Sequence, residues 1–458
     1  MPKLISISAA LLLLLCFDPF ASGQEKSEAV LSGHAIVPLN SILTPPDDVP
    51  GHLQTSGKYT HPDSKRRDDV EAISGKDRNR PRVKDVNLPV EGQPFQGFSG
   101  IRMLKDGTAV IVTDNGFGTA KNSPDAVLMF HRVKIDWEKG EVKLLKTIYL
   151  HDPDRIIPFR ITNEATDKRY LTGADIDPES IQVVGDSVFI GDEFGPYIIR
   201  TDLDGKLTGF WELSINGKTL RSTDHYTFQS LPVPGPVTFD VKKSRGFESM
   251  AVSPDGKYLY PIVEAPLWIE ETGSFENMDG KYYVRIYEFD LEKGVFTGRS
   301  FKYALEDKNH SVTDFNLIND RTGLVIERDP GEGDVALACN GNKAEAAAGN
   351  CFDDPARFKR IYKIDMGDVD KDGFVKKAAY IDLLGIKDPN GVSRLGAKTP
   401  VFTFPFETTE GVDVYDPSHI VILNDNNFGF SSGRTLGKND DNEFILLKVG
   451  EFLKRDTE

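Results

Sequence analysis

The sequence FESMAVSPDGKYLYPIVE (residues 247–264) contains two apolar runs on either side of the turn pair Asp255-Gly256. This arrangement predicts a β-hairpin that folds at its midpoint. The first and last residues of such a hairpin lie side by side across the ladder. Glu248 and Glu264 are therefore expected together at the open end of the hairpin, away from the turn.

Four further segments have the same organisation of two short apolar runs around a turn. Their small or acidic ends are 13 to 15 residues apart, at residues 99–114, 179–192, 314–327 and 410–425. The five segments begin 66 to 96 residues apart, which is long enough for a four-stranded sheet in each repeat. No long stretch has a helical period, so the sequence predicts an all-β chain.

Radial repetition of four-stranded antiparallel sheets gives a β-propeller, which explains how so long a chain can form one domain. We predict six or seven blades, because the N-terminal region with residues 282–302 or 360–382 would add one or two to the five visible units. In this fold the polar ends of the hairpins encircle one rim of the central channel. A pair of β-sandwiches is the alternative, but it requires no acidic residue at the end of every unit.

The N-terminal region divides into two parts before the propeller, which we place at residues 95–458. Residues 1–23 have a basic Lys3, an apolar run and the small residues Ala21-Ser22-Gly23, which together predict a signal peptide. Residues 24–94 are expected to be a partly flexible extension, of which Ala35-Ile36-Val37 pairs with a later sheet. No apolar run reaches the roughly 20 residues of a membrane span. We expect a secreted or periplasmic protein, most simply a monomer.

Charge and cysteine content agree with this compartment. The net charge of −16 disfavours nucleic acid as a partner and suits divalent cations, although an acidic surface also aids solubility. Cys339 and Cys351 remain after removal of the signal peptide, and in an oxidising compartment they are expected to form a disulfide worth about 3 kcal/mol.

The predicted rim gathers oxygen ligands. Ca²⁺ takes six to eight carboxylate, amide or water oxygens, and such a ring offers them. Alternatively, the same side chains cap turns and join blades through hydrogen bonds. The candidate metal ligands are Asp114, Asn115, Glu179, Glu264, Glu327, Asp329, Glu410, Asp425 and Asn426.

The same hairpin units contain candidate residues for catalysis and substrate binding. No Gly-x-Ser-x-Gly, His-Glu-x-x-His or Cys-x-x-Cys motif is present, so a hydrolase would use activated water, with Asp192, Glu193 or Glu248 as general base. Arginine forks bind phosphates in a bidentate manner, but they also form salt bridges between blades. The candidate substrate-binding arginines are Arg102, Arg200, Arg245 and Arg328.

Several of these motifs resemble the phytase-like family, which is described as "esterase-like activity of phytase". They include Gly97-Phe98-Ser99-Gly100, Asp192-Glu193-Phe194-Gly195-Pro196-Tyr197, Arg245-Gly246-Phe247-Glu248-Ser249, Glu327-Arg328-Asp329 and Asn424-Asp425-Asn426-Asn427-Phe428. The resemblance implies a secreted propeller with phosphoesterase activity on a small phosphoester or other anionic substrate. A lactonase-like hydrolase and a non-catalytic propeller that binds a ligand or an envelope partner are the alternatives.

Overall fold

A computed structural model describes residues 24–60, 71–72, 76–77, 80–81, 87–229, 238–396 and 398–454 of the chain. The predicted signal peptide and most of the charged stretch of the extension lie outside these residues. Within the described residues, no helix has the length and apolar character needed to cross a membrane.

Strands dominate the structure and form five four-stranded antiparallel sheets. Their order from the innermost strand outward is as follows. The first sheet comprises β11 (Phe98–Met103), β12 (Ala109–Thr113), β13 (Met129–Asp136) and β14 (Glu141–Tyr149), and the second β15 (Pro178–Val184), β16 (Ser187–Asp192), β17 (Tyr197–Asp202) and β18 (Leu207–Glu212). The third comprises β21 (Phe247–Val252), β22 (Tyr258–Val263), β26 (Lys281–Asp290) and β27 (Val295–Ala304), and the fourth β28 (Ser311–Leu317), β29 (Thr322–Arg328), β30 (Lys359–Val369) and β31 (Val375–Asp382). The fifth comprises β34 (Thr409–Asp416), β35 (His419–Asn424), β36 (Asn442–Lys448) and β2 (Val30–Val37).

Shorter elements lie outside the five sheets or at their margins. β1 (Glu25–Ser27) adds to the edge of the fourth sheet in parallel with β31. Small hairpins in the connections include β19 (Ser214–Ile215) with β20 (Lys218–Thr219) and β23 (Trp268–Ile269) with β24 (Ser274–Phe275). The helices of the described residues are short: α1 (Tyr226–Gln229), α2 (Lys343–Ala348) and α3 (Gly450–Lys454).

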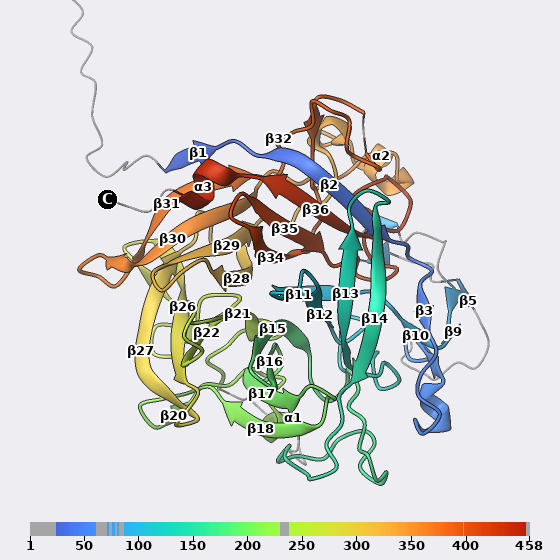
Figure 1. Ribbon diagram of the computed structural model, residues 1–458, viewed down its shortest axis with the longest axis vertical. Helices are drawn as coiled ribbons and strands as arrows, with labels where there is room; N and C mark the ends of the chain where they lie inside the picture. The colour runs from blue at the N-terminus through green and yellow to red at the C-terminus, as the bar shows by residue number, and fades with distance from the viewer. Residues whose placement is uncertain are drawn as a thin grey trace, which may run out of the picture.

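The five sheets form a closed ring. Each innermost strand contacts the next in the order β11, β15, β21, β28, β34, and β34 contacts β11 again. Figure 1 shows the ring face-on, with these strands nearest its centre and the outer strands at its circumference. The arrangement is that of a β-propeller, as predicted.

The expected number of six or seven blades is not confirmed, because the described residues supply five such sheets. Residues 282–302 and 360–382 were expected to supply an additional blade. They instead fall in β26 and β27 of the third sheet and in β30 and β31 of the fourth. These two segments thus form the outer strands of sheets whose inner hairpins were already identified in the sequence.

The ring is closed by strands from both ends of the chain. β2 pairs antiparallel with β36, with Ala35 opposite Phe444 and Val37 opposite Asn442, so the predicted pairing of the extension is confirmed. Figure 1 shows β2, in blue, beside β36, in red. His34 Nε2 lies 2.9 Å from the Glu443 carboxylate, and both side chains are fully buried. Residues near each terminus therefore share one sheet, which ties the ring shut.

Apolar residues fill the spaces between neighbouring sheets. Ile262 and Ile286 of the third sheet, for example, pack with Phe315 and Tyr362 of the fourth. Equivalent clusters lie at the four other sheet interfaces of the ring. Each sheet is therefore buried on both faces, which explains why its strands are apolar almost throughout.

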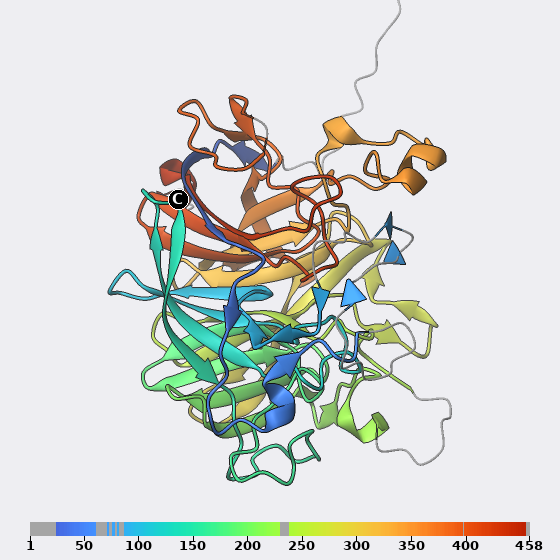
Figure 2. The same cartoon turned by 90° about the vertical axis from the view of Figure 1, so that its right-hand side faces the viewer.

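The predicted disulfide between Cys339 and Cys351 is confirmed, with a Cα–Cα distance of 5.0 Å. It closes a loop that contains the short helix α2. This helix is capped by the Asn342 side chain at its start and by Gly349, in the left-handed conformation, at its end. In Figure 2 this loop, in orange, projects from the ring at the upper right.

Candidate active site

The same irregularity occurs in all five inner hairpins. In each, the pairing register shifts by one residue near the start of the innermost strand, as in a β-bulge. The extra residues are Ser99, Glu179, Glu248, Thr313 and Glu410. Across the ladder, the position one residue beyond the partner of the residue before the bulge holds Asp114, Glu193, Glu264, Arg328 and Asp425.

A backbone hydrogen bond holds the second of these positions in four of the repeats. The amide of Glu193 donates to the carbonyl of Asp177 at 2.9 Å, and the amide of Glu264 donates to Gly246 at 3.0 Å. Asp114 and Asp425 make the corresponding bonds to Gly97 and Thr408. The five repeats therefore present two rings of side chains at one end of the channel, largely as the sequence predicted.

Except for Ser99 and Thr313, these side chains line a cavity of about 190 Å³ at the mouth of the channel. Its lining contains nine carboxyl groups and two guanidinium groups, and no histidine or cysteine of the described residues belongs to it. The acids are Asp114, Asp177, Glu179, Glu193, Glu248, Glu264, Glu407, Glu410 and Asp425, and the arginines are Arg245 and Arg328. We call this space the acid cavity.

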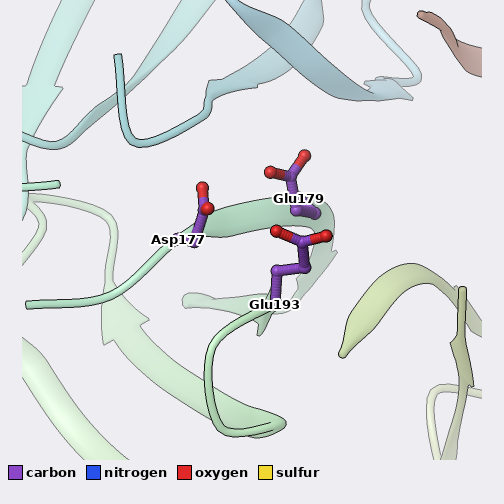
Figure 3. Close-up of side chains that lie close together, drawn as sticks. All are labelled: Asp177, Glu179 and Glu193. Carbon is purple, nitrogen blue, oxygen red and sulfur yellow. The ribbon is translucent and has the colours of Figure 1, made fainter. Parts of the chain in front are cut away.

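Carboxylate oxygens approach one another closely within the acid cavity. Three groups of three acids each have oxygens within 4.8 Å of one another: Asp177, Glu179 and Glu193; Glu179, Glu248 and Glu410; and Glu193, Glu248 and Glu264. Any two of these triads share one residue, so the three form one continuous patch of oxygen atoms. Figure 3 shows the first triad, with Glu179 and Glu193 converging from β15 and from the loop after β16.

Burial and mutual repulsion raise the pKa of most of these acids. Burial, together with the charges of Asp177 and Glu248, holds the pKa of Glu179 well above its usual range. The pKa values of Glu248 and Glu410 are raised in the same way. Burial raises the pKa of Asp177 to about 6. Like charges this close disfavour ionisation unless a cation accompanies them.

Glu264 is the exception in the acid cavity. Burial acts against its ionisation, but the neighbouring guanidinium groups of Arg245 and Arg328 outweigh this and lower its pKa. Arg245 forms an ion pair with the Glu264 carboxylate. Nη2 of Arg328 lies 3.7 Å from the same carboxylate and 3.8 Å from that of Glu410. The two arginines thus gather on the side of the cavity formed by the third and fourth sheets.

Ten of the predicted site residues line the acid cavity. They are Asp114, Asn115, Glu179, Glu193, Glu248, Glu264, Glu410, Asp425, Arg245 and Arg328. The structure brings together residues that are up to 311 positions apart in the chain, from Asp114 to Asp425. The remaining predicted residues lie elsewhere, and each has a local partner.

Asp192, predicted as a catalytic residue, does not line the acid cavity. Its carboxylate accepts hydrogen bonds from the amides of Asp177 at 2.8 Å and Gly195 at 2.6 Å. It therefore holds the turn that presents Glu193. Side chains on adjacent residues of a strand point to opposite sides, which separates Asp192 from Glu193.

Three predicted metal ligands are also placed outside the cavity lining. Glu327 accepts hydrogen bonds from Tyr303 of the third sheet at 2.8 Å and from Lys377 of its own sheet at 2.7 Å. Asp329 pairs with Lys359 at 2.9 Å and accepts from the amide of Phe358. The Asn426 side chain donates to the carbonyl of Asp440 at 3.1 Å.

Two of the predicted substrate-binding arginines also lie away from the acid cavity. Arg102 contacts Asn316 and Asp413, three residues beyond the bulge on β28 and β34, and so belongs to a hydrogen-bonded group that crosses the channel. Arg200 lies on β17, the third strand of its sheet, and stacks over Trp211 at 5.5 Å.

Asp177 and Glu407 line the acid cavity but were not predicted. Asp177 immediately precedes Pro178 at the start of β15 and is hydrogen-bonded by Asn115 through both its backbone amide and its side chain. A signal was present in the sequence, because Asp177 stands two residues before Glu179. Glu407 likewise stands three residues before Glu410, so acids just ahead of the hairpins also reach the rim.

The donor set fits a hard cation. All three triads consist of carboxylates, and oxygen ligands suit Ca²⁺ and Mg²⁺, whereas zinc and copper sites normally include nitrogen or sulfur. The raised pKa values also indicate a cation site, because a bound divalent cation would supply positive charge to balance the clustered carboxylates.

A family model described as "Phytase-like: Esterase-like activity of phytase" matches residues 93–428. The chain belongs to the phytase-like family. The match covers most of the ring, from the segment before β11 to the end of the Asn-Asp-Asn-Asn-Phe motif. This agrees with the resemblance inferred from the motifs.

Other comparisons add little. No curated protein matches the sequence. A luciferin-regenerating enzyme is 10% identical over 83% of this chain and 95% of its own, with a TM-score of 0.32. A putative 6-phosphogluconolactonase from Bacteroides uniformis is 11% identical over 84% of this chain and 94% of its own, with a TM-score of 0.27.

Proposed function

We propose that this protein is an exported hydrolase that cleaves phosphoric esters at the acid cavity with the help of a divalent cation, Ca²⁺ in the first instance. The proposal is supported most directly by the three overlapping carboxylate triads, in which Glu264 is paired with an arginine but Glu179 and Glu248 are held beside other acids. Membership of the phytase-like family supports hydrolysis of an ester.

We assign the acids of the triads as ligands of the cation. Among them, Glu179 and Glu410 have no role in proton transfer. A cation bound here supplies polarisation of a phosphoryl oxygen and of a water molecule. Glu193 and Glu248 are the predicted bases that line the cavity, and the pKa of each is held well above the usual range, mainly by burial. Such a carboxylate is a stronger proton acceptor near neutral pH than an ordinary one.

Arg328 and Arg245 are assigned to the phosphoryl group. Guanidinium groups match the geometry of phosphate oxygens and stabilise the charge that develops on them during transfer. Both arginines lie on one side of the acid cavity, which fixes the orientation of the ester relative to the triads.

Export is supported by the disulfide and by the predicted signal peptide. Disulfides persist in oxidising compartments and are rare in the cytosol. We therefore propose a secreted or periplasmic location.

The test is an assay of the purified mature protein. p-Nitrophenyl phosphate, bis-p-nitrophenyl phosphate, phytate and a lactone are offered with calcium and then with EDTA. The proposal expects phosphoric ester hydrolysis that EDTA abolishes and that Glu193→Gln or Glu248→Gln reduces at least a hundredfold, as removal of a general base does. Arg132→Gln is the matched surface control, because Arg132 pairs with Asp106 at the opposite end of the first hairpin.

The alternatives make different predictions in this assay. Turnover of the lactone alone would favour a lactonase-like enzyme. No turnover of any substrate, with EDTA lowering only the melting temperature, would contradict an enzymatic function and favour a propeller that binds a ligand or an envelope partner.

A further inference from the structure

Of the five repeats, the fourth is the one with no acid at either rim position. Where the second, third and fifth units have a glutamate at the bulge, the fourth has Thr313. Where the other four units have an acid across the ladder, the fourth has Arg328. One segment of the rim thus lacks both carboxylates and carries a positive charge instead.

Arg328 is buried but incompletely paired. Its exposed fraction is 6%, and its Nε has no hydrogen-bond partner among the described residues. Nη2 lies 3.7 and 3.8 Å from Glu264 and Glu410, which is beyond normal hydrogen-bond distance. A buried donor without a partner is unfavourable, and more so when it is charged. An anion in the acid cavity would supply the missing acceptor.

The total charge of the cavity limits which anion can enter. When all groups are ionised, nine carboxylates and two guanidiniums leave seven negative charges. Even three divalent cations, one for each triad, would leave the lining with one negative charge. Arg245 is already paired with Glu264, so Arg328 is the arginine with donors to spare. A substrate with several phosphate groups would meet a site with no surplus of positive charge.

On the basis of the hydrolase function proposed above, we propose that the substrate class is a phosphodiester, whose single negative charge is bound by Arg328. Water attacks the phosphorus atom, and the bond from phosphorus to one ester oxygen breaks. A cavity carboxylate takes the proton from water and passes it to the departing alkoxide. The products are one alcohol and one phosphomonoester. The product carries a second charge near neutral pH, because its second pKa is about 6. Because the cavity has no surplus of positive charge, the added negative charge favours release of the phosphomonoester.

The first experiment compares ligands of different charge on the wild-type protein in saturating calcium at pH 8. Bis-p-nitrophenyl phosphate has one negative charge, p-nitrophenyl phosphate has two, and fructose 1,6-bisphosphate has two phosphate groups. We expect kcat/KM for the diester to exceed that for the monoester at least tenfold, and fructose 1,6-bisphosphate not to inhibit. Equal or faster hydrolysis of the monoester, or strong inhibition by the bisphosphate, would overturn the proposal.

The second experiment tests Arg328 itself. Arg328→Gln is expected to raise KM for the diester about tenfold with a smaller effect on kcat, and Arg328→Lys should recover part of this loss because it retains the charge. Arg132→Gln should leave KM unchanged. The melting temperature in calcium is recorded for each variant, so that loss of fold is distinguished from loss of binding. An unchanged KM in folded Arg328→Gln would contradict the assignment.

Calorimetric titration separates failure of this inference from failure of the hydrolase proposal. Diethyl phosphate and fructose 1,6-bisphosphate are titrated into the calcium-loaded protein. If no ester is hydrolysed, the hydrolase proposal fails, but tighter binding of diethyl phosphate that is lost in Arg328→Gln would still support the anion site. Tighter binding of the bisphosphate, or binding of neither compound, would overturn it.

Discussion

Two groups of buried carboxylates in this protein differ in what neutralises them. Glu179, Glu248 and Glu410 lie together in the acid cavity, and the pKa of each is held well above its usual value by burial and by neighbouring acids. Glu327 and Glu443 are just as buried, but cationic partners lower the pKa of each. Lys377 pairs with Glu327, and Arg434 pairs with Glu443.

The difference shows that burial alone does not identify a functional acid. The paired acids are satisfied by the protein and hold sheets or chain ends together, as Glu443 does at the closure of the ring. Apart from Glu264, the acids of the cavity have no comparable partners, so their charge must be balanced from outside the protein or suppressed by protonation. This asymmetry is the basis for placing chemistry in the acid cavity.

The largest expected effect comes from removing a paired acid. Glu327→Gln leaves the buried Lys377 with the partly exposed Glu306 as its remaining carboxylate partner, and we expect a loss at the lower end of the about 3 to 5 kcal/mol that breaking a buried pair typically costs. The cavity substitution Glu179→Gln should instead raise the melting temperature of the calcium-free protein, because it removes a repelling charge. Thermal unfolding in EDTA measures both. Equal losses of stability in the two variants would show that the two groups of acids do not differ as described.

The pH dependence of stability should also separate the groups. Burial raises the pKa of Asp177 from 3.8 to about 6 and that of Asp425 to about 7. The unfolded chain therefore loses these protons at lower pH than the folded chain does, and the stability of the calcium-free protein should fall as pH rises from about 4 to 7.

The contribution of Glu443 to stability changes with pH in the opposite direction. Its pKa is lowered to about 2, so its contribution is present above pH 4.5 and is lost only as pH falls toward 2. Calcium should restore stability more at pH 7.5 than at pH 5, since the cavity acids must be ionised to bind it. Urea unfolding across this pH range, with and without calcium, provides the measurement. A calcium effect that does not grow with pH would argue against the acid cavity as its site.

The smallest effect is expected at an exposed ion pair. Lys146 lies 2.6 Å from Asp204, but both side chains are more than half exposed. Exposed pairs of this kind contribute little, so Asp204→Asn should leave both the melting temperature and the calcium response close to those of the wild type. A clear change in either quantity would mean that charge in general, and not its position in the acid cavity, controls these properties.

The inner hairpins allowed much of the site to be predicted from the sequence. Ser99 with Asp114, Glu248 with Glu264, and Glu410 with Asp425 are the bulge and rim positions that the spacing identified. In the second unit the spacing paired Glu179 with Asp192, one residue short of the rim residue Glu193. In the fourth it selected Asp314 and Glu327 in place of Thr313 and Arg328.

The errors have a common physical cause. A bulge adds one residue to one strand, and a shift of one residue moves a side chain to the other face of a sheet. Spacing alone does not locate a bulge, so an acid one position away was preferred over the threonine or arginine that occupies the rim. The expected number of blades is not confirmed in the described residues for a related reason. A sequence pattern does not distinguish the outer strands of one unit from the start of another.

Calcium binding is the most direct test of the central claim that the acid cavity is a cation site. Isothermal titration of calcium into metal-free protein at pH 7.5 compares the wild type with Glu248→Gln and with the surface control Asp204→Asn. The account predicts that the wild type and Asp204→Asn bind calcium alike and that Glu248→Gln, which removes a member of two triads, binds it at least tenfold more weakly. No binding by the wild type, or equal binding by Glu248→Gln, would contradict it.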